Sequence, residues 1–169
     1  MLEPYISKNG ELVEIDKAAI PLDSVEFTYG YGVYENLKVR NRILYFPEEH
    51  CERLLRSASI IGITTSLKKE TIQKNTIDLV KKIKEDSFNI KILLLGKKND
   101  ADLYIMALAP KFIPKTLYNQ GIKVITYKGE RHFPQAKTLN MLQSYLAFRE
   151  AKKGDAYDAL LVHPDRKST

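Results

Sequence analysis

The stretch Val33-Tyr34-Glu35-Asn36-Leu37-Lys38-Val39 alternates apolar and polar residues, which is the period of a half-buried β-strand. Arg40-Asn41-Arg42 follows as a polar turn, and residues 43–46 are predicted to form a returning strand. Pro47 ends that strand and suits the first turn of a helix. The first third of the chain therefore predicts a sheet that leads into a helix.

The residues around this strand predict further elements of both kinds. Asn9-Gly10 lies between two short extended stretches, as in a β-hairpin turn. From Glu48 apolar residues recur with helical spacing up to Gly62, and a second helix is predicted after Ser66. Strands are then predicted over residues 90–95 and 103–109. The predicted apolar faces comprise Leu54, Leu55, Ala58 and Ile61 in the first helix and Ile72, Thr76, Leu79, Val80 and Ile83 in the second.

Pro110, Pro114 and Asn119 interrupt this pattern and predict a domain boundary. Beyond it we expect strands over residues 122–127 and 159–162, with a helix from about Leu139 to Lys153 between them. This order of elements favours an α+β fold over alternating βαβ units. The predicted organisation is a smaller N-terminal domain over residues 1–109, an interdomain linker over 110–119, and the beginning of a larger domain over 120–169.

Composition narrows the class of protein. Of the 169 residues, 44% are hydrophobic and 28% are charged, which is typical of a globular chain rather than a disordered one. No apolar run is long enough to span a membrane and the N-terminus lacks the apolar core of a signal peptide, so we expect a cytoplasmic protein without a membrane partner. Cys51 is the single cysteine and no two histidines have metal-ligand spacing, so we expect neither an internal disulfide nor a metal site.

Two basic side chains are candidates for a site. His50 and Arg53 are three residues apart and share a helix face at the first turn of the helix, where free N–H groups and the helix dipole favour a phosphate. The alternative is an ordinary arginine on a solvated helix start. Lys137 stands between an irregular loop and a helix, and a lysine kept partly out of water becomes a usable nucleophile for Schiff-base chemistry. The alternative is a solvated charge.

A third candidate is the glycine-rich stretch Tyr29-Gly30-Tyr31-Gly32. Its glycines permit a close approach of the backbone and its tyrosines supply hydroxyl groups, although a tight turn between half-buried aromatics explains it equally well. It lacks the third glycine of a dinucleotide-binding fingerprint. The net charge of +6 raises the possibility of nucleic acid, but the lysines lie mainly opposite apolar helix faces, so we expect no nucleic-acid partner.

Taken in order, three motifs resemble the class IV pyridoxal-phosphate-dependent aminotransferases. They are Tyr-Gly-x-Gly-Val-Tyr-Glu from Tyr29, Phe-Pro-x-x-His-x-x-Arg-Leu-x-x-Ser-Ala from Phe46, and Arg-x-x-x-x-x-Lys-x-Leu-Asn from Arg131. This family includes branched-chain aminotransferase, D-amino acid aminotransferase and aminodeoxychorismate lyase. The resemblance implies the family's two-domain fold, with the smaller N-terminal α/β sandwich domain complete and the larger C-terminal domain only partly present.

The resemblance also implies roles for individual residues. Lys137 matches the catalytic lysine that holds pyridoxal 5'-phosphate as a Schiff base, and Arg53 matches the arginine that binds the cofactor phosphate. Tyr29, Tyr34 and Lys38 fall where the family places substrate-binding side chains. By the same resemblance we expect an aminotransferase of amino acid metabolism, branched-chain aminotransferase-like, that takes an amino acid and a 2-oxo acid as a homodimer.

The chain departs from the family near its end. The family's glutamate that keeps the cofactor ring nitrogen protonated follows the last predicted strand, whereas this sequence stops at Thr169. A truncated chain and a chain that has lost catalysis are both open; we expect truncation, because a domain seldom stops in mid-sheet with an open edge. The loop Gly96–Asp102 also lacks the arginine and histidine with which the D-amino acid branch binds a carboxylate.

Two alternative functions stay open at this point. One is the lyase, which would eliminate pyruvate from aminodeoxychorismate with the same lysine. The other is a basic, non-catalytic binding module, which would bind nucleic acid in a salt-dependent way and take no cofactor.

Overall fold

The computed structural model describes residues 2, 4–20, 24–110, 112–163 and 165. Lys167, Ser168 and Thr169, at which the sequence stops, lie outside the described residues. The chain divides into two compact units. The first comprises Met1–Pro110 with Gln135–Leu139, and the second comprises Lys111–Pro134 with Asn140–Thr169. A five-residue segment that follows the predicted boundary thus returns to the first unit.

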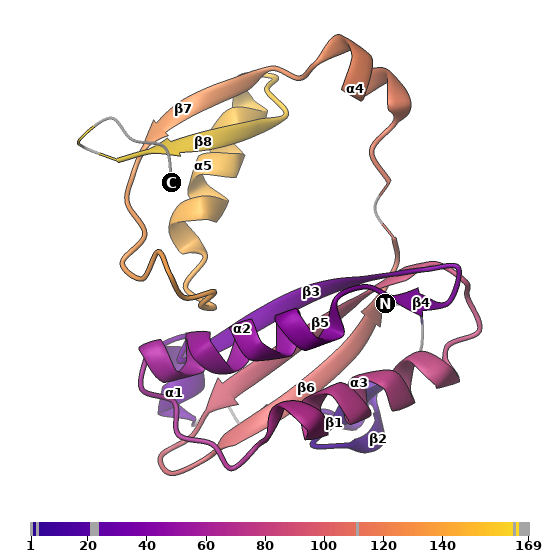
Figure 1. Cartoon of the computed structure of the whole chain (residues 1–169). Coiled ribbons are helices and arrows are strands. Elements are labelled where there is room, and N and C mark those ends of the chain that lie inside the picture. The colour runs from indigo at the N-terminus through magenta and orange to yellow at the C-terminus, as the bar shows by residue number, and fades with distance from the viewer. Residues whose placement is uncertain (1, 3, 21–23, 111, 164, 166–169) are drawn as a thin grey trace. The chain divides into compact units, whose positions relative to one another are not determined.

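The first unit is built on a six-stranded antiparallel sheet with the strand order β2-β1-β6-β5-β3-β4 (Figure 1). β3 pairs with β5 along nearly its whole length, from Gly32 opposite Leu95 to Val39 opposite Phe88. On its other edge, β4 pairs only with the last two residues of β3. The strands are β1 (Tyr5–Lys8), β2 (Glu11–Glu14), β3 (Gly32–Arg40), β4 (Ile43–Leu44), β5 (Phe88–Gly96) and β6 (Ala101–Leu108).

Two helices, α2 (Pro47–Ile60) and α3 (Lys69–Lys82), lie across one face of this sheet (Figure 1). The core is the layer between them and the strands, because the apolar side chains of both helices turn toward the sheet. All five residues predicted for the apolar face of the second helix are buried. In the first helix Leu54 and Ala58 are buried as predicted, and Cys51 and Ser57 share that buried face.

The hairpin predicted at Asn9-Gly10 joins β1 to β2. Both residues have positive φ, 52° and 94°, which the primed two-residue turns of tight hairpins require. Two short elements after it were not predicted, a 3-10 turn over Ile15–Lys17 and the helix α1 over Val25–Thr28. α1 begins at Ser24, whose hydroxyl accepts a hydrogen bond from the N–H of Phe27 at 3.3 Å.

The second unit has α4 (Lys115–Gln120), β7 (Val124–Lys128), α5 (Leu142–Lys153) and β8 (Asp158–Val162). β7 and β8 are parallel, and α5 connects them along one face of the pair (Figure 1). This is a βαβ connection, a kind of unit that the sequence analysis disfavoured, although the larger sheet is antiparallel and the chain as a whole is α+β. α4 lies mostly within the residues predicted as linker.

The described residues contain neither a membrane-spanning helix nor a metal-binding group of side chains. No helix in them is long and apolar enough to cross a membrane. Within the same residues, no three histidine, cysteine, aspartate or glutamate side chains are grouped so that they could hold a metal ion.

The single thiol of the chain provides a probe of the core. Burial of Cys51, together with the nearby negative charge of Glu35, raises the pKa of its thiol to about 11. Because the thiolate is the reactive form, we expect no reaction with Ellman's reagent at pH 8 in the folded protein and full reaction in denaturing urea. Rapid colour release by the folded protein would contradict this packing of α2.

Candidate functional site

Residues 137–139 pair with the start of β3 through an isolated antiparallel bridge between Thr138 and Val33. The N–H of Tyr34 donates to the carbonyl of Lys137 at 2.9 Å, and the N–H of Leu139 donates to the carbonyl of Gly32 at 2.9 Å. This part of the edge is available because β4 pairs only with the far end of β3. The position of Lys137 along the sheet is therefore set by backbone hydrogen bonds.

The register also selects the face of the sheet on which Lys137 lies. Thr138 is opposite Val33 in an antiparallel bridge, and residues directly opposite each other share a face. Lys137 consequently shares the face of Tyr34, and its Nζ is 4.5 Å from the centroid of that ring. Lys91 of β5 approaches the same ring, with Nζ 5.8 Å from the centroid. The predicted nucleophile is thus partly buried against an aromatic ring.

A buried hydroxyl group supports the same segment from α2. The Oγ of Ser57, which is 0% exposed, accepts a hydrogen bond from the N–H of Lys137 at 3.2 Å. Ala136, the preceding residue, is also buried. The lysine backbone is thereby attached both to the sheet and to the helix above it. The sequence analysis quoted Ser57 within a motif but assigned it no role.

Glu35, the next residue of β3 after Tyr34, points to the opposite face, because side chains alternate along a strand. It is completely buried beneath α2, where the side chains of Arg53 and His50 approach it. Its Oε1 accepts from Nε of Arg53 at 2.5 Å and its Oε2 accepts from Nη2 of Arg53 at 2.6 Å. Nδ1 of His50 lies 2.8 Å from Oε2. The three side chains form one partly buried cluster around the buried carboxylate, the Glu35–Arg53–His50 cluster.

The ionisation of Glu35 reflects two opposing effects. Burial raises its pKa, because desolvation disfavours the charged form, but hydrogen bonds and positive charge from Arg53 and His50 more than compensate and lower the pKa below its ordinary value. Removing one partner of a buried ion pair leaves an uncompensated charge and typically costs about 3–5 kcal/mol. The cluster therefore ties α2 to β3 through charge as well as through apolar packing.

Sequence analysis did not single out Glu35, although the strand pattern contained a signal. Val33, Leu37 and Val39 lie on the buried face of β3, and Glu35 falls on the same face by alternation. A carboxylate at a core position requires a cationic partner. The spacing of Arg53 and His50 on one helix face was the complementary signal.

The predicted position of Arg53 in the first turn of the helix is wrong. α2 begins at Pro47, so Arg53 lies in the second turn of the helix, about 9 Å along its axis from the start. The first turn contains Glu48 and Glu49. Their carboxylates interact favourably with the positive end of the helix dipole and disfavour a phosphate there. Arg53 is consequently placed by Glu35 and not by the helix terminus.

The remaining predicted residues are more dispersed. Tyr29 follows the last residue of α1, and it is 82% exposed. Lys38 shares the face of Tyr34 but lies four residues farther along β3, which is about 13 Å. Arg131 and Asn140 belong to the second unit. Of the predicted residues, the first unit brings Lys137 into contact with Tyr34, and Arg53 into contact with His50.

The loop after β5, which lacks an arginine and a histidine, carries two lysines as its cationic side chains. Nζ of Lys97 is 2.6 Å from Oδ1 of Asp102, so this ammonium already has an anionic partner within the loop. Lys98 is exposed at the tip of the same turn. The loop thus offers the single unpaired point charge of an exposed lysine in place of the planar fork of an arginine, and a point charge fixes the orientation of a carboxylate less well.

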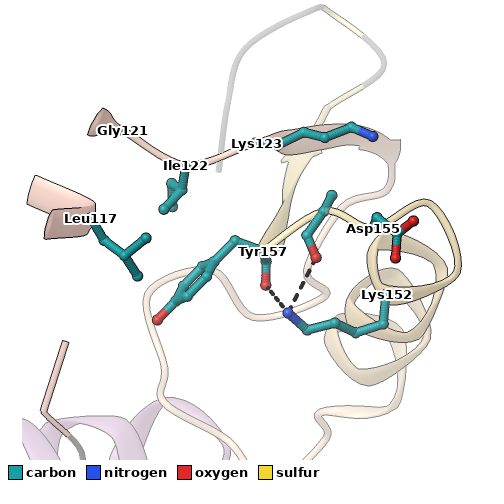
Figure 2. A pocket seen from close by; sticks show the side chains of 8 residues that line it. Leu117, Gly121, Ile122, Lys123, Lys152, Asp155 and Tyr157 are labelled. Atoms are coloured by element: carbon teal, nitrogen blue, oxygen red, sulfur yellow. Dashed lines mark hydrogen bonds between the residues drawn. The ribbon is translucent and has the colours of Figure 1, made fainter. Parts of the chain in front are cut away.

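The second unit has an open pocket of about 420 Å³ (Figure 2). Its lysines are committed to the backbone: Nζ of Lys152 donates to the carbonyls of Ala156 at 3.2 Å and Tyr157 at 2.8 Å, and Nζ of Lys123 donates to the carbonyl of Gly154 at 2.7 Å. None of the predicted site residues lines this pocket, and its polar groups serve the turn between α5 and β8.

The sequence of the chain is similar to those of known aminotransferases. The family model described as amino-transferase class IV matches residues 32–169, well over half of the chain. A D-alanine aminotransferase from Bacillus licheniformis is 27% identical over 164 residues, which cover 91% of this chain and 58% of that protein. The chain therefore spans less than two thirds of the length of this curated relative.

Solved structures share the fold. A branched-chain aminotransferase from the archaeon Thermoproteus uzoniensis, solved with norvaline, matches with a TM-score of 0.85 at 23% identity, covering 98% of this chain and 61% of that one. A T.th. branched-chain amino acid aminotransferase solved with pyridoxamine 5'-phosphate matches with a TM-score of 0.87 at 22% identity and the same coverage. The likeness includes both units of the chain.

The close approach of Leu139 to β3 makes Gly32 a test of this pairing. A Cβ at Gly32 would lie 2.7 Å from Cδ1 of Leu139 and 3.0 Å from the carbonyl oxygen of Leu94. We expect Gly32→Ala to lower the free energy of unfolding by about 1–3 kcal/mol and to loosen the Lys137 segment, as measured by urea unfolding and by amide exchange. The control is Gly154→Ala, whose Cβ would have its nearest neighbour at 3.7 Å. Equal effects of the two substitutions would argue against this packing.

The Glu35–Arg53–His50 cluster also predicts a pH dependence of stability. Since the pKa of Glu35 is lowered by folding, its ionised form stabilises the protein above the ordinary glutamate range, and this contribution is lost as the pH falls below about 4. We expect the free energy of unfolding of the wild type to fall more steeply between pH 6 and about pH 3 than that of Glu35→Gln, as measured in urea. Glu49→Gln, which changes an exposed carboxylate, serves as the control; parallel curves for wild type and Glu35→Gln would refute the prediction.

Proposed function

Because the chain belongs to the class IV aminotransferase family, we propose that the intact protein is a pyridoxal-phosphate-dependent aminotransferase. It transfers an amino group between an amino acid and a 2-oxo acid. The observation that supports this most directly is the placement of Lys137, whose backbone is fixed to β3 while its amine lies over the Tyr34 ring.

The residues present fit this cofactor by their chemistry. Pyridoxal phosphate has an aldehyde, which a primary amine captures, and a phosphate, which a guanidinium recognises through paired N–H donors. The first unit supplies a partly buried amine in Lys137 and a half-exposed guanidinium in Arg53. Both are fixed to β3 through adjacent residues, Lys137 through Tyr34 and Arg53 through Glu35.

Each residue then has a distinct task. Lys137 would hold the cofactor through its aldehyde, and its amine, once freed by the substrate, would take the proton from the substrate Cα and deliver it to the carbon that carried the aldehyde. Arg53 binds the phosphate. Tyr34 restricts the amine to one side of its ring, and Tyr29 and Lys38 contribute to the substrate pocket. The cofactor, when bound, supplies an electron-withdrawing ring that stabilises negative charge at Cα.

The wider setting of the protein follows from the same family. We propose that it is cytoplasmic and works as a homodimer in amino acid metabolism. The named relatives are aminotransferases, so no observation favours the pyruvate-eliminating lyase, and the family match disfavours a nucleic-acid-binding module. The relatives are named for D-alanine and for branched-chain substrates, and the ion pair between Lys97 and Asp102 supports neither choice over the other.

Trapping the cofactor on the lysine tests the proposal. After incubation with pyridoxal phosphate and reduction with borohydride, we expect one label per chain, mapped by peptide mass to Lys137, and loss of that label in Lys137→Ala. Lys91→Ala is the matched control, because Lys91 approaches the same ring from 5.8 Å; it should retain the label on Lys137. Full-length protein labelled evenly over its surface lysines, with none preferred, would overturn the proposed function.

A further inference from the structure

Glu35 is a buried charged group for which the proposed reaction has no direct use. Among the described residues it is the one charged side chain that is fully buried, and the apolar residues of the core surround it on β3. Burying a carboxylate is expensive, and a hydrophobic residue of similar size would stabilise this position as well or better. The structure therefore offers a reason to look for a task beyond stability.

The geometry of its partner indicates that task. A guanidinium has five N–H donors in a rigid plane, and Glu35 takes two of them, on Nε and Nη2 of Arg53. This bidentate contact fixes the plane and rotation of the group along one edge. Nη2 also lies 3.3 Å from Nδ1 of His50, so the two N–H groups of Nη1 remain for another acceptor, and the Arg53 side chain is 45% exposed. His50 contacts the Oε2 atom of the carboxylate, so the carboxylate itself is restrained.

We propose that Glu35 is a positioning residue that fixes the Arg53 guanidinium so that its remaining N–H groups bind the phosphate of the cofactor. This inference rests on the proposed function. Without Glu35, the long arginine side chain would have to be ordered at the moment of binding, and that lost conformational freedom weakens affinity. The carboxylate also places a negative charge close to the phosphate site, so its presence is favourable only if orientation outweighs repulsion.

The comparison of two aldehydes isolates the phosphate contact. Pyridoxal carries the same aldehyde as pyridoxal phosphate but no phosphate, so the ratio of their dissociation constants reports on Arg53, while general damage to the fold changes both constants together. We expect the wild type to prefer pyridoxal phosphate and Glu35→Gln to reduce that preference about tenfold, which corresponds to the cost of ordering one long side chain. Binding is measured by absorbance of the captured aldehyde on full-length protein.

Three further variants make the result decisive. Arg53→Met removes the phosphate contact, and the double variant Glu35→Gln/Arg53→Met also removes the stranded carboxylate; we expect the double variant to lose no more preference than Arg53→Met alone. Glu35→Asp keeps the buried charge but shortens its reach by one methylene, and it should lie between wild type and Glu35→Gln. This variant keeps the proposal testable if Glu35→Gln folds poorly.

Each outcome has a separate meaning. A wild-type preference that persists in Glu35→Gln and Glu35→Asp would overturn the positioning role alone, as would tighter binding of pyridoxal phosphate by Glu35→Gln, which would mean that charge repulsion dominates. Failure of the wild type to capture either aldehyde at Lys137 would overturn the proposed function, and this inference with it.

Discussion

A carboxylate inside an apolar core is the constraint on which the first unit depends. Glu35 is buried on β3 and cannot remain ionised there without cations, so α2 must present Arg53 and His50 to it at one position and in one rotation. Apolar contacts alone tolerate small shifts of a helix over a sheet, because they are non-directional. The bidentate ion pair is directional, and it fixes the helix over the strand.

The same strand serves both faces of the sheet with neighbouring residues. The backbone of Tyr34 pairs with Lys137 and its ring supports the lysine amine, while Glu35 fixes Arg53 on the other side. Alternation along a strand makes this possible, since consecutive side chains point to opposite faces. β3 thus contacts the segment of Lys137 through Tyr34 and the guanidinium of Arg53 through Glu35, its next residue.

Much of the architecture could be predicted from local pattern. The alternation in β3, the turn at Asn9-Gly10 and the apolar faces of α2 and α3 are encoded by neighbouring residues, and the structure has them where they were expected. The predictions for the end of the linker and the start of α5 were less accurate. The predicted third helix was extended back to Leu139, but residues 138 and 139 pair with β3 and α5 begins at Leu142. Pairing with a distant strand overrides the local helical preference, and the neighbouring residues contain no pattern that predicts this pairing.

By itself, the sequence determined most of the elements and the α+β class, and its motifs led to Lys137 and Arg53 as the proposed amine and guanidinium. Only the tertiary structure determined that the segment of Lys137 completes the edge of β3, that Ser57 anchors its backbone, and that Arg53 is placed by Glu35 rather than by the helix terminus. These contacts join residues 18 to more than 100 apart in the chain. Their partners are chosen by strand register and helix rotation, which depend on how the whole core packs and cannot be obtained from the spacing of residues along one element.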